Sequence, residues 1–177
     1  MLITISGPPG SGTTTVSRRV AEALGLERVP GGEVFRQMAA EAGRSLAEFG
    51  AYAQVHPEID LELDRRLEAR AREGDCVIES RLAGWLATRA DLTAVRVWIG
   101  CDEAVRAQRV AQREGTTPDQ AAADNAERAA LEHARYRAVY DIDLSDQSIY
   151  DLVLDSTRVA PGELAEVIIA EAHATFA

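Results

Sequence analysis

The chain has 177 residues, of which 46% are apolar, so it is suited to one globular domain and lacks the composition of a disordered protein. Its formal net charge of −10, with a sequence pI of about 4.8, argues against a general binder of nucleic acids or anionic membranes. No run reaches the roughly 18 consecutive apolar residues that a membrane span needs, and no basic residue precedes the apolar N-terminus as in a signal peptide. We therefore expect a cytoplasmic protein with no nucleic-acid or membrane partner.

All 19 basic residues are arginine, because the chain contains no lysine. An excess of acid without lysine indicates a halophile-like protein of a salt-adapted cytoplasm. A GC-rich genome would also replace lysine by arginine, so both explanations stay open.

The first part of the chain alternates apolar runs with glycine breaks. Residues 2–6 are expected to form a buried strand, residues 14–25 a helix, and residues 27–30 a short second strand. Three further helices are expected at residues 33–42, 45–53 and 56–73. The second of these has Ser45 as its cap and Glu48 at the capping-box position.

The same alternation continues to the C-terminus. Further strands are expected at residues 76–79, 94–99 and 151–155, and further helices at residues 82–89, 102–113, 118–140 and 161–174. The segment 114–118 is polar and typical of a loop. Since neither an internal repeat nor a linker is visible, residues 1–177 are expected to form one domain of the α/β class with a parallel sheet.

The loop after the first strand has the glycine spacing of the Walker A motif, G-x-x-x-x-G-K-[ST]. Glycines let backbone N–H groups turn toward a phosphate, and the helix that begins near its end adds a positive dipole. The last hydroxyl of such a motif coordinates Mg²⁺. The loop therefore predicts a site for the phosphates of a nucleotide. Its residues are Gly7, Pro8, Pro9, Gly10, Ser11, Gly12, Thr13, Thr14 and Thr15.

One position departs from the motif, because Thr13 stands where a lysine bridges the β- and γ-phosphates. With no lysine elsewhere, the positive charge must come from arginine or from the metal, or be absent. The alternative is an ordinary glycine-rich turn, but the flanking strand and helix favour a phosphate loop.

Arginines lie on both sides of the polar segment 114–118. Arg109 and Arg113 are four residues apart and share a helix face, and Arg128, Glu132 and Arg135 share another. A lid that closes arginines onto ATP has this arrangement. The alternative is a solvated helix whose charge pairs contribute only about 0.2–0.5 kcal/mol each.

The ends of the second and third expected strands carry further charged residues. Ligands of open α/β sheets bind beyond the carboxyl ends of the strands. The third strand ends in Glu79, Ser80 and Arg81, where the acid could hold Mg²⁺ through water and the arginine could hold a second phosphate group. Arg36 follows the second strand in the same way.

Asp60 and Asp64 are four residues apart and could form a carboxylate pair, but we interpret them as the polar face of an amphipathic helix. Other side chains show no metal-ligand spacing and are interpreted as core or surface residues. They are Cys76, Cys101, His56, His133, His173, Trp85 and Trp98.

With these residues in hand, the chain closely resembles the archaeal type of cytidylate kinase, a branch of the P-loop nucleoside monophosphate kinases, over nearly its full length. Five sequence blocks in the same order are a more specific signal than the loop alone. The loop ending GTTT is usual in that group, so the resemblance implies that Thr13 is a family trait. The blocks are GPPGSGTTT at 7–15, GEVFR at 32–36, HPEIDLELDRR at 56–66, ESRLAG at 79–84 and RYRAVYDIDLSDQSIYD at 135–151.

The resemblance implies a monomer with a five-stranded parallel sheet, a CMP-binding insertion at about 33–73 and a lid at about 113–128. It implies that loop 7–15 holds the ATP phosphates and that Thr14 and Glu79 serve Mg²⁺. Bacterial relatives have Asp at the position of Glu132. The further roles implied are CMP binding by Arg36, Arg81 and Glu132, adenine contact by Arg109, and catalysis by Arg113, Arg128 and Arg135.

The reaction implied is transfer of phosphate from ATP to CMP or dCMP. Alternatives that use the same loop are a kinase for AMP, UMP or a shikimate-like acceptor, and a regulatory NTP-binding module without an acceptor. A regulatory GTPase is disfavoured, because its N-K-x-D guanine motif requires a lysine.

Overall fold

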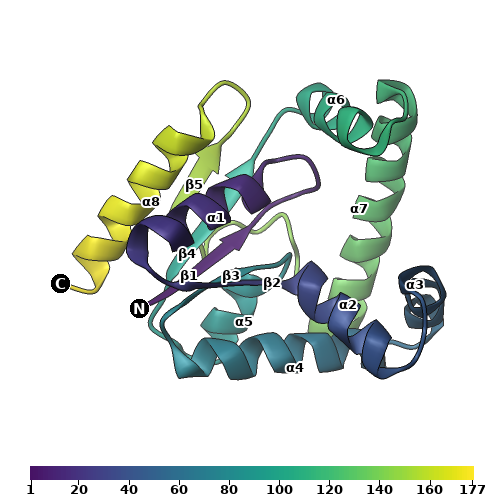
Figure 1. Ribbon diagram of the computed structural model, residues 1–177, viewed down its shortest axis with the longest axis horizontal. Coiled ribbons are helices and arrows are strands. Elements are labelled where there is room, and N and C mark those ends of the chain that lie inside the picture. Colours follow the sequence, from purple (N-terminus) through teal and green to yellow (C-terminus); the bar gives the residue numbers. More distant parts are fainter.

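The computed structural model describes the backbone of residues 1–177 and every side chain except that of Ala47. Within these residues the centre of the molecule is a parallel five-stranded sheet in the order β2-β3-β1-β4-β5 (Figure 1). The strands are β1 (Leu2–Ser6), β2 (Glu27–Pro30), β3 (Cys76–Glu79), β4 (Val95–Gly100) and β5 (Leu152–Asp155). The predicted α/β fold with a parallel sheet is therefore confirmed.

Helices connect the strands, and their ends differ from the predicted ends by at most two residues. They are α1 (Thr13–Leu24), α2 (Gly31–Glu41), α3 (Leu46–Val55), α4 (Glu58–Glu73), α5 (Ala83–Arg89), α6 (Glu103–Glu114), α7 (Pro118–Tyr140) and α8 (Pro161–Thr175). The predicted capping box of α3 is confirmed, because the Ser45 hydroxyl accepts from the Glu48 N–H while the Glu48 carboxylate accepts from the Ser45 N–H. In the described chain, no helix has the length and apolar character needed to cross a bilayer.

Helices lie on both faces of the sheet (Figure 1). On one face, Ile3 of β1 packs with Val20 of α1 and Ile168 of α8. On the other face, Leu2 lies in a cluster with Leu67 of α4 and with residues of α5. The neighbours Leu2 and Ile3 are both buried but join different clusters, as expected for a strand that is covered on both sides.

The strand register aligns the carboxyl ends of β2, β3 and β1 at one edge of the sheet. Glu79 of β3 is paired with Pro30 of β2 and with Ile5 of β1. The phosphate loop follows β1, Arg81 follows β3, and α2 begins directly after β2. This shared edge is where an open parallel sheet binds its ligands, and it brings the phosphate loop, Glu79 and Arg81 into one region.

Two helical segments flank this edge and have small clusters of their own. Met38 and Phe49 belong to a cluster between α2 and α3, and Val110 and Ala121 belong to one between α6 and α7. These segments contain the predicted acceptor-binding insertion (33–73) and lid (113–128), a division that stays a prediction. The connection between α6 and α7 spans only residues 115–117, so most of the predicted lid is helical.

Candidate active site

The loop between β1 and α1 requires glycine at its turning points. Gly10 and Gly12 have φ angles of 81° and 85°, which lie in the left-handed region that favours glycine. Gly10 also lacks room for a side chain, because an added Cβ would lie 2.7 Å from the carbonyl oxygen of Arg106. Since α1 begins at Thr13, the unpaired N–H groups of its first turn lie at the end of this loop. The arrangement is that of an anion-binding helix start.

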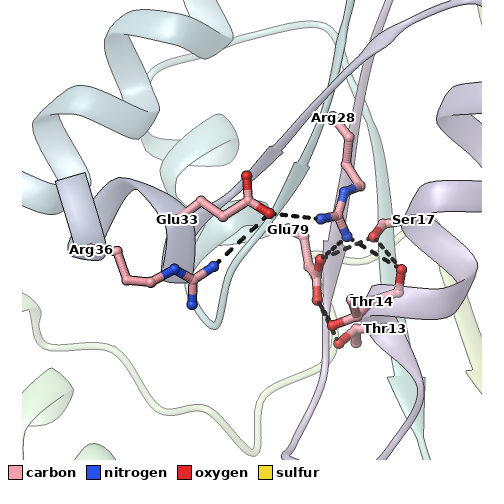
Figure 2. A network of polar contacts seen from close by, with 7 residues as sticks. All are labelled: Thr13, Thr14, Ser17, Arg28, Glu33, Arg36 and Glu79. Carbon is pink, nitrogen blue, oxygen red and sulfur yellow. Dashed lines mark hydrogen bonds and ion pairs between the residues drawn. The ribbon is translucent and has the colours of Figure 1, made fainter. Parts of the chain in front are cut away.

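The carboxylate of Glu79, at the end of β3, holds the junction between this loop and α1 (Figure 2). Its Oε1 accepts hydrogen bonds from the hydroxyls of Thr13 and Thr14 at 3.0 and 2.6 Å. Its Oε2 accepts one from the Ser17 hydroxyl at 3.0 Å and one from Arg28 Nη1 at 3.3 Å. Donors from α1 and β2 thus converge on one carboxylate that is only 12% exposed.

Ser17 and Arg28 were missed by the sequence interpretation. Arg28 also donates to the carbonyl oxygen of Thr14 at 3.4 Å and forms an ion pair with Glu33 at 3.0 Å. Its positive charge therefore lies beside the junction at which Thr13 replaces the motif lysine. An arginine within a four-residue strand was the signal that could have drawn attention to it.

Thr14 and Glu79 fit a Mg²⁺ ion that is bound together with a nucleotide. Mg²⁺ takes one or two protein oxygens and completes its octahedral shell with water and substrate phosphates. The Thr14 hydroxyl and Glu79 Oε1 provide such oxygens 2.6 Å apart. A search of the described residues finds no group of three or more His, Cys, Asp or Glu that could hold a metal. The ion would thus depend on phosphate oxygens for its remaining ligands.

Glu132 of α7 connects two of the predicted arginines to the loop. Its carboxylate accepts hydrogen bonds from Arg81 Nε at 2.7 Å and from Arg128 Nε at 2.8 Å, and Arg81 also donates to the carbonyl oxygen of Gly7. Burial raises the pKa of the Glu132 carboxyl, but the charges and hydrogen bonds of Arg81 and Arg128 outweigh burial, so this pKa lies below its usual value. The cluster carries two positive charges against one negative charge.

A cavity of about 400 Å³ connects the phosphate loop with this arginine cluster and with α2, α3 and α4. Its volume is in the range of small-molecule sites. The lining residues come from the loop, from the ends of the strands and from helices α2, α3, α4 and α7. Those used below are Gly7, Thr13, Asp60, Asp64, Glu79, Ser80, Arg81, Arg128, Glu132 and Arg135.

The interpretation of Asp60 and Asp64 as only the polar face of an amphipathic helix was wrong, because both side chains are largely buried. Asp64 is only 8% exposed and accepts a hydrogen bond from the hydroxyl of Tyr140 on α7. Asp60 forms an ion pair with Arg135, whose Nη1 lies 3.1 Å from Asp60 Oδ2. Both carboxylates line the cavity. The buried stripe of α4 includes Asp64, Leu67 and Ala71, so helical spacing counted from its apolar positions could have indicated this.

Burial determines the proton affinity of both carboxylates. Desolvation raises the pKa of Asp64 to about 6, and the hydrogen bond from Tyr140 offsets only part of this effect. Desolvation also raises the pKa of Asp60, although the positive charge of Arg135 acts in the opposite direction. When both carboxylates are ionised, their two negative charges face the single positive charge of Arg135, so the α4 side of the cavity is negative overall.

Three predicted arginines do not line the cavity, and two of them, Arg36 and Arg113, are exposed. Arg36 is 57% exposed and lies 4.0 Å from Glu33, to which Arg28 is also paired (Figure 2). Arg113 is 62% exposed and pairs with the adjacent Glu114. The structure therefore does not bring Arg36 and Arg113 together with Arg81, Arg128 and Arg135.

Arg109 lies on the opposite side of the phosphate loop. It donates to the carbonyl oxygen of Gly10 at 3.3 Å and to the hydroxyl and carbonyl oxygens of Ser156 at 3.0 and 2.8 Å. The Ser156 hydroxyl in turn donates to the carbonyl oxygen of Ser11 at 2.7 Å. A second hollow of about 600 Å³ lies beside this contact and includes Cys101. Ser156 was missed, although it directly follows β5 and the rule on strand ends applies to it.

Comparison with known proteins connects this geometry to a family. A family model described as "Cytidylate kinase-like family" matches residues 2–158. The chain belongs to this family. It is 49% identical over 161 residues to a cytidylate kinase of Pyrococcus horikoshii, covering 91% of this chain and 82% of that protein. It is 46% identical over 171 residues to one of Halorubrum lacusprofundi, covering 96% and 88%.

Solved structures with low sequence identity share the fold of this family member. A gluconokinase from Sinorhizobium meliloti has a TM-score of 0.64 at 16% identity, and a shikimate kinase from Acinetobacter baumannii in complex with shikimate has 0.63 at 16%. Each match covers 98% of this chain and 93% of the other. These likenesses support the fold alone.

The raised pKa of Asp64 gives a stability that depends on pH. Because the carboxyl binds its proton more tightly in the folded chain, its contribution is fully present below about pH 4 and is lost as the pH rises through about 6. Replacement by Asn removes this dependence and keeps an acceptor for Tyr140. We therefore expect the stability of Asp64→Asn relative to wild type to rise between pH 4 and pH 7, by roughly 2–3 kcal/mol.

Urea unfolding at several pH values measures this difference. The exposed Asp124→Asn variant removes the same formal charge from the surface of α7 and controls for net charge. A stability difference between Asp64→Asn and wild type that stays constant over the same range would contradict the assignment.

Proposed function

We propose that the chain transfers the γ-phosphoryl group of ATP to CMP and dCMP, giving CDP and dCDP, with Mg²⁺ bound to the nucleotide. The observation that carries this proposal is the cavity in which the phosphate loop meets the cluster of Arg81, Arg128 and Glu132. Relatives that are 42–49% identical over most of the chain are cytidylate kinases, which supports a kinase and this choice of acceptor.

The transfer requires no strong general base, because the attacking oxygen belongs to a phosphate that is already anionic. Catalysis then depends on positioning, charge neutralisation and exclusion of water. Glu132 keeps two guanidiniums side by side that would otherwise repel each other. ATP and the acceptor monophosphate are both highly charged anions, and the chain itself has a net charge of −10. Arginines beside the phosphates must therefore neutralise them locally.

The roles we propose divide the arginines between the two substrates. Arg81 and Arg36 hold the acceptor phosphate, with Glu132 placing Arg81, and Arg109 covers the adenine ring. The exposed Arg36 and Arg113 would reach the phosphates when their segments close over the substrates, as lids of kinases do. Near the transferred phosphate we place Arg113, Arg128 and Arg135, the last of which would have to leave its ion pair with Asp60 to reach it.

The Thr14 hydroxyl would hold Mg²⁺, and Glu79 would hold it through water. Bound there, the ion supplies positive charge for the β- and γ-phosphates. Thr13 donates its hydroxyl to Glu79, and Arg28 keeps the carboxylate in place from the other side. The loop residues Gly7 to Thr15 provide backbone N–H groups for the triphosphate.

The acceptor is tested by measuring ADP production with ATP, Mg²⁺ and a panel of CMP, dCMP, UMP, AMP and shikimate, at low and at molar KCl. We expect kcat/KM for CMP and dCMP to exceed the values for the others by at least about 100-fold. Faster turnover with another acceptor would contradict the choice of CMP. Hydrolysis of ATP that no acceptor accelerates would favour a regulatory NTP-binding module, and the two salt concentrations test salt adaptation.

Replacement of Arg81 by Ala should lower kcat/KM for CMP by about 10²- to 10³-fold, because a charge that neutralises the phosphates is lost. The KM for CMP should rise and kcat should fall. The matched control is Arg72→Ala. It removes an exposed arginine of α4 that is paired with Glu68. Thermal unfolding identifies any loss of folding, since Glu132 loses one of its two partners. Unchanged kinetics in a folded Arg81→Ala variant would exclude this role.

A further inference from the structure

The cavity has an acidic side that phosphate binding does not explain. Asp60 and Asp64 lie one turn apart on α4, and the Asp60 side chain is 15% exposed. Even with Arg135 paired to Asp60, this side keeps a net negative charge that repels phosphate. The phosphates of both substrates should therefore lie at the other side, near Arg81 and the loop. The part of the acceptor that faces α4 is then its base.

Polar atoms of residues that line the cavity have unused hydrogen-bonding capacity. Among the described residues, Asp60 Oδ2, Ser80 Oγ and Arg135 Nε are buried and have no hydrogen-bond partner. Arg135 Nη1 lies close enough to Asp60 for an ion pair, but the two atoms are not aligned for a hydrogen bond. Buried polar groups are almost always satisfied, so a donor from a ligand is the natural partner of Asp60.

Cytosine and uracil differ most at the position that a carboxylate reads best. Cytosine carries a 4-amino group that donates hydrogen bonds, and Asp and Glu accept from it. Uracil carries a carbonyl oxygen at the same position, whose lone pairs would face the carboxylate and leave it unsatisfied. The charge of Asp64, one turn along α4, adds to the repulsion of that oxygen.

We propose that the Asp60 carboxylate accepts a hydrogen bond from the 4-amino group of the acceptor base and thereby excludes UMP. This inference rests on the proposed function, for which it names a residue that determines specificity. This hydrogen bond would separate CMP from UMP. It would not separate CMP from AMP, because adenine also presents an amino group. In the alternative reading, Asp60 and Arg135 only join α4 to α7 and contact no base.

The kcat/KM values for CMP and UMP distinguish these readings. The Asp60→Asn variant should lose about 10- to 100-fold with CMP and gain with UMP, because the Asn amide can rotate its NH₂ group toward the uracil oxygen. Glu73→Gln makes the same acid-to-amide change at an exposed position on α4 and should leave the ratio unchanged. If the Asp60 variant lost activity equally with both nucleotides, the inference would be overturned in favour of the structural reading.

A substrate analogue gives a test that needs no variant to fold. The monophosphate of pyrimidin-2-one riboside lacks the 4-amino group, and wild-type enzyme should use it about 10- to 100-fold less well than CMP. The Asp60→Asn variant should show little of this difference, as a double-mutant cycle requires. Equal use of CMP and the analogue by wild type would overturn the inference alone. Transfer to neither CMP nor UMP by wild type would overturn the proposed function, and this inference with it.

Discussion

The contact between the Glu79 carboxylate and the start of α1 is the interaction on which the candidate active site depends. Parallel register places the end of β3 beside the end of β1, so that one side chain reaches Thr13, Thr14 and Ser17 together. The loop has no lysine at the Thr13 position. The hydrogen bonds to Glu79 and the contact with Arg28 instead hold the junction between the loop and α1 in place. The carboxylate oxygen that accepts from Thr13 and Thr14 is the one that we propose for a hydrated metal ion.

The charges that line the cavity differ in sign from one side to the other, although the net charge of the chain is unfavourable for binding phosphates. The chain is strongly acidic, yet Glu132 is shared by Arg81 and Arg128 at the wall of the cavity, which leaves a local surplus of positive charge beside the phosphate loop. The α4 side has the opposite sign, with Asp60 and Asp64 in poorly hydrated positions. A nucleoside monophosphate has the same polarity, since its phosphate is anionic and its base carries donors. The cavity can therefore orient its ligand by charge as well as by shape.

Local patterns were sufficient to predict the fold. Apolar runs, glycine breaks and caps predicted every strand and helix, because short-range rules determine where these elements begin and end. The phosphate loop and the ends of β1 and β3 could also be found from sequence, since a parallel sheet brings its strand ends together whatever the details of packing.

The contacts that were missed depend on tertiary packing. Asp64 was interpreted as part of the polar face of α4, but in the folded chain it is covered by α7 and accepts a hydrogen bond from Tyr140. Arg28 and Ser156 gain their roles from partners 51 and 145 residues away, which spacing along the chain does not reveal. The roles of Arg36 and Arg113 stay predictions. Their proposed positions at the phosphates depend on closure of their segments over the substrates.

We propose that Glu79 prepares the phosphate loop for a nucleotide bound with Mg²⁺. The test is calorimetric binding of a non-hydrolysable ATP analogue to wild-type and Glu79→Gln protein, with and without Mg²⁺. We expect Mg²⁺ to strengthen binding to wild type by at least about 10-fold. The Gln variant should lose most of this gain and bind the metal-free nucleotide at least as well, since a negative charge near the triphosphate is gone. An equal gain from Mg²⁺ in both proteins would contradict it.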